Sequence, residues 1–127
     1  MSEHAELDLP LSARYATTVR AVAASMAATI SMSIDDIDDL RLGVNEAISV
    51  LTDIDDDAAS PGRLTVRFEV EHDRIRVTAG RRGVDGQPPV ELDVLAERIL
   101  AAVVDEYSVD DTGAFLLVKQ VPADGDS

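Results

Sequence analysis

Cysteine and tryptophan are absent from this chain of 127 residues, and aromatic residues make up only 3% of it. Without cysteine there is no disulfide framework and no thiolate chemistry. No apolar run approaches the roughly 18 residues that a membrane-spanning helix needs, and the N-terminal residues lack the basic-then-apolar pattern of a signal peptide. We therefore expect a cytoplasmic protein without a membrane partner, whose core is built from valine, isoleucine, leucine and alanine.

Basic residues are also scarce, because 11 lysines and arginines face 25 aspartates and glutamates, for a formal net charge of −14. Nucleic acid is excluded as a partner on this ground, since binding it requires clustered cationic side chains that displace counterions. A basic protein surface, in contrast, would be steered toward this one. The acidity could equally serve only solubility or a salty cytoplasm, and composition alone does not separate the two readings.

The length of the chain fits one domain with a sizeable core. We expect a single domain over residues 5–121, flanked by disordered tails at 1–4 and 122–127, where the residues are polar or acidic. A three- to four-residue spacing of apolar side chains predicts helices, and strict alternation predicts strands. The elements expected on these grounds are a strand over 5–10, helices over 14–30 and 36–51, a hairpin of strands 64–70 and 75–79, a helix within 88–106, and a closing hairpin around the turn at 110–113.

The helix over 36–51 is the element around which the others are organised. Its apolar face is formed by Ile37, Leu40, Val44, Ile48 and Leu51. Ser33 is the expected N-cap, and the aspartates that follow it are favoured by the helix dipole. Glu46 and Val50 are four residues apart, so they project together from a second face of the helix.

The acidic loop after this helix has the spacing of the first ligands of a calcium loop, at Asp53, Asp55 and Asp57. That motif also needs glycine at its sixth position and glutamate at its twelfth, and Ala58 and Leu64 stand there instead. The two histidines of the chain offer no catalytic or metal-binding spacing. We expect a solvated loop and no metal site.

The run DLRLGVNEA over residues 39–47 resembles the "DLRLAVxEA" helix of bacterial anti-sigma factors of the serine-protein-kinase type, which belong to the GHKL ATPase superfamily. Further matches in the same order are Leu9-Pro10, Val19-Arg20, and the segments 103–109 and 112–120. The resemblance implies a histidine-kinase-like ATPase fold. This is an α/β two-layer sandwich, with three helices packed on one face of a mixed, mostly antiparallel sheet.

The same resemblance implies roles for individual residues. Glu46 stands at the position of the family's general base, whereas Val50 replaces the asparagine that holds magnesium and has no oxygen to offer a hard cation. Asn45 lies about 100° away on the helix and cannot take over that role. The position of the family's adenine-binding aspartate falls at Ala79 or Arg81, with Asp85-Gly86 as a displaced version of the motif.

A further departure concerns the phosphate site of the family, a glycine-rich box at a helix N-terminus. The segment 88–106 contains no glycine. We therefore expect a regulatory protein that binds a sigma factor or a partner-switching antagonist as a homodimer, without a cofactor and without ATP turnover. The alternative is an active ATP-dependent serine/threonine protein kinase, in which Glu46 is the base and Asp53 substitutes as a magnesium ligand.

Overall fold

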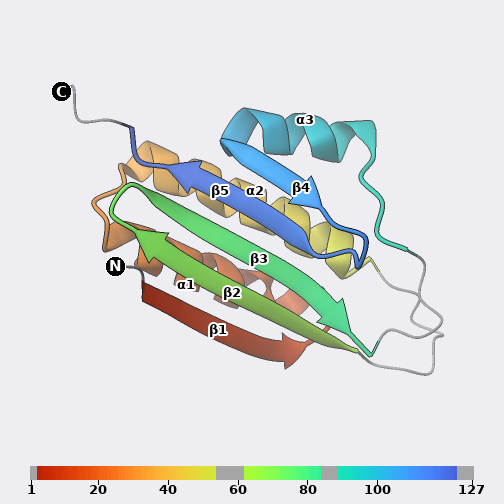
Figure 1. Cartoon of the computed structure of the whole chain (residues 1–127). Helices are drawn as coiled ribbons and strands as arrows, with labels where there is room; N and C mark the ends of the chain where they lie inside the picture. The colour runs from red at the N-terminus through yellow and green to blue at the C-terminus, as the bar shows by residue number, and fades with distance from the viewer. Residues whose placement is uncertain (1–2, 54–61, 84–88, 123–127) are drawn as a thin grey trace.

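A single sheet forms one layer of the protein, and three helices cover one of its faces (Figure 1). The computed structural model describes residues 3–53, 62–83 and 89–122. The strands are β1 (Glu3–Pro10), β2 (Arg63–Glu71), β3 (Arg74–Arg82), β4 (Glu106–Val109) and β5 (Phe115–Gln120). The helices are α1 (Ala16–Ala28), α2 (Ile34–Leu51) and α3 (Val94–Val103), and a short 3-10 turn, η1 (Ala13–Tyr15), precedes α1. This arrangement confirms the two-layer sandwich expected from the sequence.

The strand order is β1-β2-β3-β5-β4, and every neighbouring pair in the described sheet is antiparallel. The expectation of a mixed sheet was therefore wrong for these residues. The helical connection from β3 to β4 passes over the sheet to its far edge, and the hairpin to β5 then returns into the gap between them. The return reverses the chain direction, so β5 runs antiparallel to both of its neighbours.

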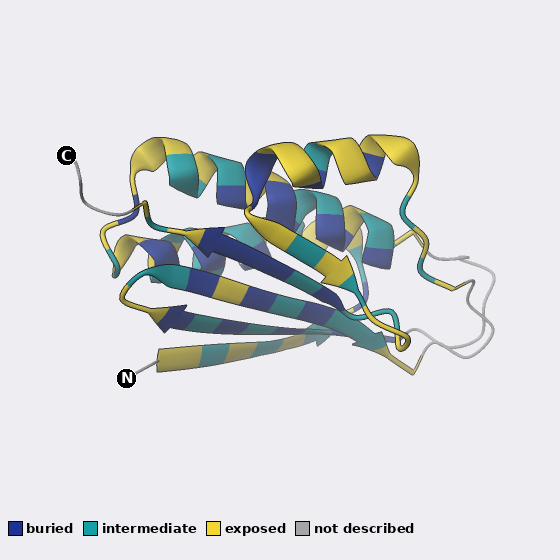
Figure 2. Cartoon of the chain, turned by 45° about the horizontal axis from the view of Figure 1, so that its top comes forward, coloured by how far each residue is buried: buried dark blue, intermediate teal, exposed yellow. Residues whose placement is uncertain are grey.

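The core lies between the sheet and the helices, and the side chains of the strands alternate between this core and the open face (Figure 2). On β2 the buried side chains are Leu64, Val66, Phe68 and Val70. They meet the buried faces of α1 and α2, which include Val19, Leu40 and Ile48. Of the apolar positions that the spacing assigned to the face of α2, Leu40, Val44, Ile48 and Leu51 are buried in this core, and Ile37 is partly buried against it.

The ends of three elements differ from the sequence-based expectation. β1 begins at Glu3, because its pairing with β2 extends to Val70. α1 begins only after the 3-10 turn. α3 begins at Val94, although the apolar pattern of the sequence starts at Val90, because Val90 and Leu92 pack against the core from a non-helical segment.

A buried lysine ties the helices to the sheet. Lys119 of β5 is only 8% exposed, and its Nζ donates to the carbonyl oxygen of Val103, at the end of α3, over 3.0 Å. Asp36 and Asp39, in the first turns of α2, lie 3.6 Å from the same nitrogen. One cation thus serves both a helix C-terminus and two carboxylates. None of the helices described is long and apolar enough to cross a bilayer.

Candidate functional site

A cavity of about 570 Å³ lies between the C-terminal half of α2 and the segment that leads into α3. Its described lining consists of Ala13, Glu46, Ser49, Val50, Thr52, Asp53, Arg81, Pro89, Val90, Glu91, Asp93 and Ala96. The sequence-based site residues Glu46, Val50 and Arg81 therefore meet in one place. We refer to this space as the helix-side cavity.

Glu46 and Val50 both line the helix-side cavity, which confirms that the four-residue spacing puts them on one face of α2. The neighbouring Asn45 points elsewhere, and its Oδ1 accepts a hydrogen bond from Arg20 of α1. The asparagine beside Glu46 therefore holds α1 against α2. It does not face the cavity, as the rotation of about 100° per residue requires.

Val50 offers no ligand to a cation, because its side chain is a hydrocarbon. Ser49 of α2 and Asp53, two residues beyond the end of that helix, both line the cavity. Among the described residues, no group of three or more histidine, aspartate or glutamate side chains is placed to hold a metal ion.

The N-terminus of α3 opens onto the helix-side cavity and is already occupied by a carboxylate of the chain. Asp93 is the N-cap residue, and its Oδ1 accepts from the backbone N–H of Ala96 over 2.7 Å. A helix N-terminus carries free N–H groups and a positive partial charge that would otherwise favour an anionic ligand. Here the anion comes from the protein.

The structure distinguishes the two residues to which the resemblance assigns the adenine-binding position. Ala79 is 2% exposed and belongs to the core under the helices, so it does not line the cavity. Arg81, two residues later on β3, does line it, and its Nη1 donates to the carbonyl oxygen of Leu51 over 3.4 Å. The candidates Asp85 and Gly86 lie outside the described residues, as do Asp55 and Asp57 of the acidic loop.

The charges that line the helix-side cavity are unbalanced. Four carboxylates, those of Glu46, Asp53, Glu91 and Asp93, face one guanidinium, that of Arg81. Glu91 and Asp93 were missed by the sequence analysis. A cap signal for Asp93 was nevertheless present, because an aspartate directly before the apolar run that starts at Val94 is a typical helix start.

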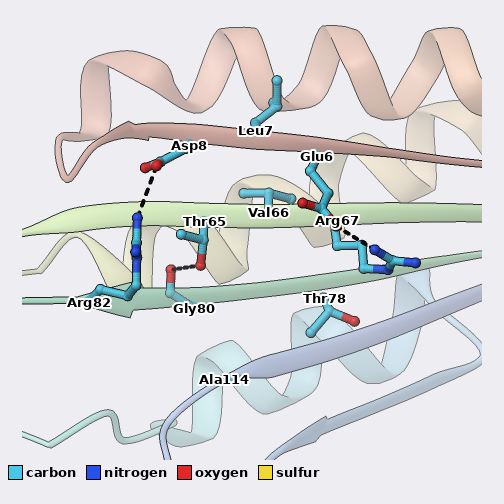
Figure 3. Close-up of a pocket in the computed structure, with 10 residues that line it drawn as sticks. All are labelled: Glu6, Leu7, Asp8, Thr65, Val66, Arg67, Thr78, Gly80, Arg82 and Ala114. Atoms are coloured by element: carbon cyan, nitrogen blue, oxygen red, sulfur yellow. Dashed lines mark hydrogen bonds and ion pairs between the residues drawn. The ribbon is translucent and has the colours of Figure 1, made fainter.

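A second hollow, of about 650 Å³, lies on the open face of the sheet over β1, β2 and β3 (Figure 3). Thr65, Thr78, Gly80 and Ala114 are among its lining residues, and the paired side chains of Glu6, Asp8, Arg67 and Arg82 stand around them. We refer to it as the sheet-face hollow.

The acids of the sheet-face hollow are neutralised by arginines. Asp8 accepts from Nε of Arg63 over 3.0 Å and from Nη2 of Arg82 over 2.9 Å, and Glu6 pairs with Arg67. The hydrogen bond from Arg63 lowers the pKa of Asp8 below its ordinary value, helped by the charges of both arginines. These contacts leave Asp8 little capacity for a ligand.

Comparison with known proteins gives a consistent result. No family model matches the chain. The serine-protein kinase RsbW of Bacillus velezensis is 25% identical over 115 residues, which cover 91% of this chain and 72% of the kinase. The crystal structure of the RsbU and RsbW domains of Rv1364c from Mycobacterium tuberculosis matches with a TM-score of 0.67 and 20% identity.

The match to the mycobacterial structure covers 93% of this chain but only 32% of the other, so this chain spans about a third of that protein. At 20% identity, the structural match shows a similar fold only. The evidence for a relation in sequence is the match to the kinase. The chain is therefore a distant homologue of the RsbW serine-protein kinases and has the histidine-kinase-like fold of their domain.

Proposed function

We propose that the protein is an anti-sigma-factor-like regulator of the cytoplasm, which binds a sigma factor or a partner-switching antagonist without turning over ATP. The observation that carries the proposal is the composition of the helix-side cavity around Glu46. A nucleotide in such a site needs a magnesium ligand, a donor set for its phosphates and an acceptor for its base. The side chains present do not fit any of the three.

The first misfit is Val50, which offers no oxygen to magnesium. The second is the start of α3, where the carboxylate of Asp93 takes the N–H group of Ala96 and would repel a phosphate. The third is Arg81, a donor at the position where an acceptor should hold the adenine amino group. Each unmade buried polar contact costs roughly 1–3 kcal/mol, so three together would weaken a micromolar ligand by several orders of magnitude.

Calorimetry with ATP and magnesium tests the proposal, with the Bacillus velezensis kinase as the positive control. We expect no measurable heat of binding at millimolar nucleotide. The variant Val50→Asn should not restore binding by itself, because Asp93 still occupies the helix start. A dissociation constant of the wild type below about 100 μM, or about −5.5 kcal/mol, would contradict the proposal.

A second candidate function has an observation in its favour. Glu46, Ser49 and Asp53 line the same cavity, so a general base and a carboxylate for magnesium are both available to an active serine/threonine kinase. Incubation of the protein and its antagonist with labelled ATP separates the two functions. Transfer of the label that is lost in Glu46→Gln, with antagonist binding retained, would establish the kinase.

The partner proposal also rests on charge. Sigma factors carry basic surfaces because they contact promoter phosphates, and a protein with a net charge of −14 can cover such a surface. Exposed charge pairs contribute only about 0–1 kcal/mol each, so charge should raise the association rate more than the affinity. Association rates that are equal at low and high salt would contradict this electrostatic part.

We also propose that the protein is a homodimer, as the resemblance to the anti-sigma kinases implies. The contact suggested by that resemblance uses β1 and α1, and β1 is an edge strand whose outer side pairs with no other described strand. Unpaired edge strands readily add a further strand. Sedimentation at tens of micromolar tests the state, and a monomer alone would count against it.

A further inference from the structure

Two large apolar side chains stand exposed beside the helix-side cavity. Val94 is 64% exposed and Leu95 is 66% exposed, whereas Leu100 of the same helix is fully buried. They follow directly on Asp93 and precede Ala96, which both line the cavity. Scattered apolar residues on a surface need no explanation, but two adjacent ones next to a cavity form a patch that a partner can cover.

The interior of the cavity combines apolar and acidic groups. Val50, Val90 and Ala96 contribute hydrocarbon, and four carboxylates against one guanidinium contribute negative charge. A side chain with an apolar stem and a cationic head, as in arginine or lysine, matches both properties at once. An anionic ligand would be repelled, and a purely apolar one would strip water from carboxylates without pairing them.

We infer that the helix-side cavity and its apolar rim, formed by Val94 and Leu95, are the docking surface for a basic amphipathic segment of a protein partner. A cationic side chain of that segment enters the cavity toward Glu46 and Glu91. An apolar neighbour covers the rim. The inference deepens the proposed function and rests on one part of it, namely that no nucleotide binds in the cavity and competes with the segment.

The carboxylates of the cavity and the apolar rim should contribute to binding in different ways. Partly exposed ion pairs contribute little net affinity but direct the approach of the partner. Burial of a leucine-sized anchor supplies the larger share, because it removes a large apolar surface from water. Loss of either part should therefore be measurable, with the apolar rim governing dissociation and the carboxylates governing association.

The probe for the test is a labelled synthetic helical peptide with leucines along one face and arginines beside them. Its control has the same composition, with the leucines distributed around all faces. Binding is followed by fluorescence anisotropy, and the amide signals of residues 46–50 and 91–97 are followed by NMR. We expect the amphipathic peptide to bind more tightly than its control and to move those signals first.

Two variants of the docking surface have matched controls elsewhere. Leu95→Ser is matched by Ile34→Ser, because Ile34 is 78% exposed at the start of α2 and lies outside the lining of the cavity. Glu91→Gln is matched by Asp35→Asn, since both carboxylates are exposed and neither makes a hydrogen bond or ion pair with another described residue. We expect about tenfold weaker binding in Leu95→Ser, about threefold weaker binding in Glu91→Gln through slower association, and less than about twofold in each control.

Other results would overturn the inference. Equal losses in variants and controls would show that the peptide responds only to the overall negative charge, and no loss in Leu95→Ser would exclude the rim. Displacement of the peptide by ATP with magnesium would overturn both this inference and the proposed function. A sigma factor or antagonist that binds wild type and the double variant Leu95→Ser/Glu91→Gln equally would leave the proposed function intact and place docking on another surface.

Discussion

The helix-side cavity and the sheet-face hollow are similar in size and opposite in chemistry. In the sheet-face hollow, Glu6 and Asp8 are paired with arginines from the neighbouring strands. The described lining of the helix-side cavity instead contains four carboxylates and one arginine. The volumes, about 650 and about 570 Å³, do not distinguish them. The amount of unpaired charge distinguishes them, because a carboxylate that is already paired with a guanidinium binds a ligand only weakly.

The difference has its origin in the secondary structure. On the sheet, antiparallel register places Glu6 directly opposite Arg67, and it places Asp8 diagonally opposite Arg63, two residues from its direct partner Thr65. Opposite charges on one face of the sheet therefore meet. The carboxylates of the helix-side cavity come from α2 (Glu46), from the residues just after it (Asp53) and from the segment before α3 (Glu91 and Asp93). No repeating geometry brings basic side chains to them, and this leaves negative charge available for a partner.

The largest effect is expected where a cation is most deeply buried. Lys119→Met keeps the volume of the side chain but removes the bond to the carbonyl oxygen of Val103 and the charge beside Asp36 and Asp39. The free energy of unfolding should fall by about 1–3 kcal/mol. Urea denaturation measures it, with Arg98→Met on the exposed side of α3 as the control. A loss below about 0.5 kcal/mol would show that the charge pairing of Lys119 is dispensable.

A second substitution changes the spacing of α2 and α3 and leaves the sheet-face hollow untouched. A Cβ atom on Gly43 would lie 2.8 Å from Cγ1 of Val104. The overlap costs roughly 1–3 kcal/mol, and alanine regains about 1 kcal/mol of helix propensity. We expect Gly43→Ala to destabilise the protein by about 1 kcal/mol, and Val104→Ala in the same chain to relieve the overlap. If Gly43→Ala destabilises the protein by the same amount with valine or with alanine at position 104, the contact is disproved.

Neutralising a carboxylate should lower stability in the sheet-face hollow but not in the helix-side cavity. Glu6→Gln breaks the pair with Arg67 and should cost up to about 1 kcal/mol. Glu46→Gln removes one carboxylate from an acidic cavity, so stability should stay unchanged or rise by a few tenths of a kcal/mol. Paired thermal melts at low salt measure both. Losses of the same sign and size would mean that the carboxylate of Glu46 stabilises the folded protein as much as that of Glu6 does.

The smallest effect concerns acid. The arginines lower the folded-state pKa of Asp8 from its ordinary 3.8, so its contribution to stability is complete above that value. The contribution is lost as the pH falls through the lowered pKa. Asp8→Asn should therefore reduce stability at neutral pH and lessen the loss of stability below about pH 4. Urea midpoints across that range measure the slope, and an unchanged acid slope would contradict the pairing.

Much of the fold could be predicted from local patterns. The spacing of apolar residues predicted α2 and its N-cap Ser33, whose hydroxyl oxygen accepts from the N–H group of Asp36, and alternation predicted the β2–β3 hairpin. The start of α3 could not be predicted in this way, because Val90 and Leu92 continue the apolar pattern while they pack from a non-helical segment. Sheet order could not be predicted either, since the insertion of β5 depends on contacts far apart in sequence.

The candidate site was predictable to the extent that it lies on α2. Helical spacing alone puts Glu46 and Val50 side by side. The choice between Ala79 and Arg81 was not predictable, because alternation places both on the same face of β3. Only the depth at which each lies under the helices separates them. The segment that carries Glu91 has no periodicity, and its position depends on the packing of Val90 and Leu92.

The position of β5 has a consequence for how the molecule assembles during synthesis. This strand is translated after the other four, yet it lies between β3 and β4, and β4 has no other partner in the described sheet. While residues 115–120 remain inside the ribosome, the inner edge of β3 is unpaired and α3 has no completed sheet beneath it. Nascent chains begin to fold from the N-terminal side, and pairing between distant segments is slow. Until residues 115–120 emerge, the protein should therefore hold an open three-stranded sheet, which closes in one late step.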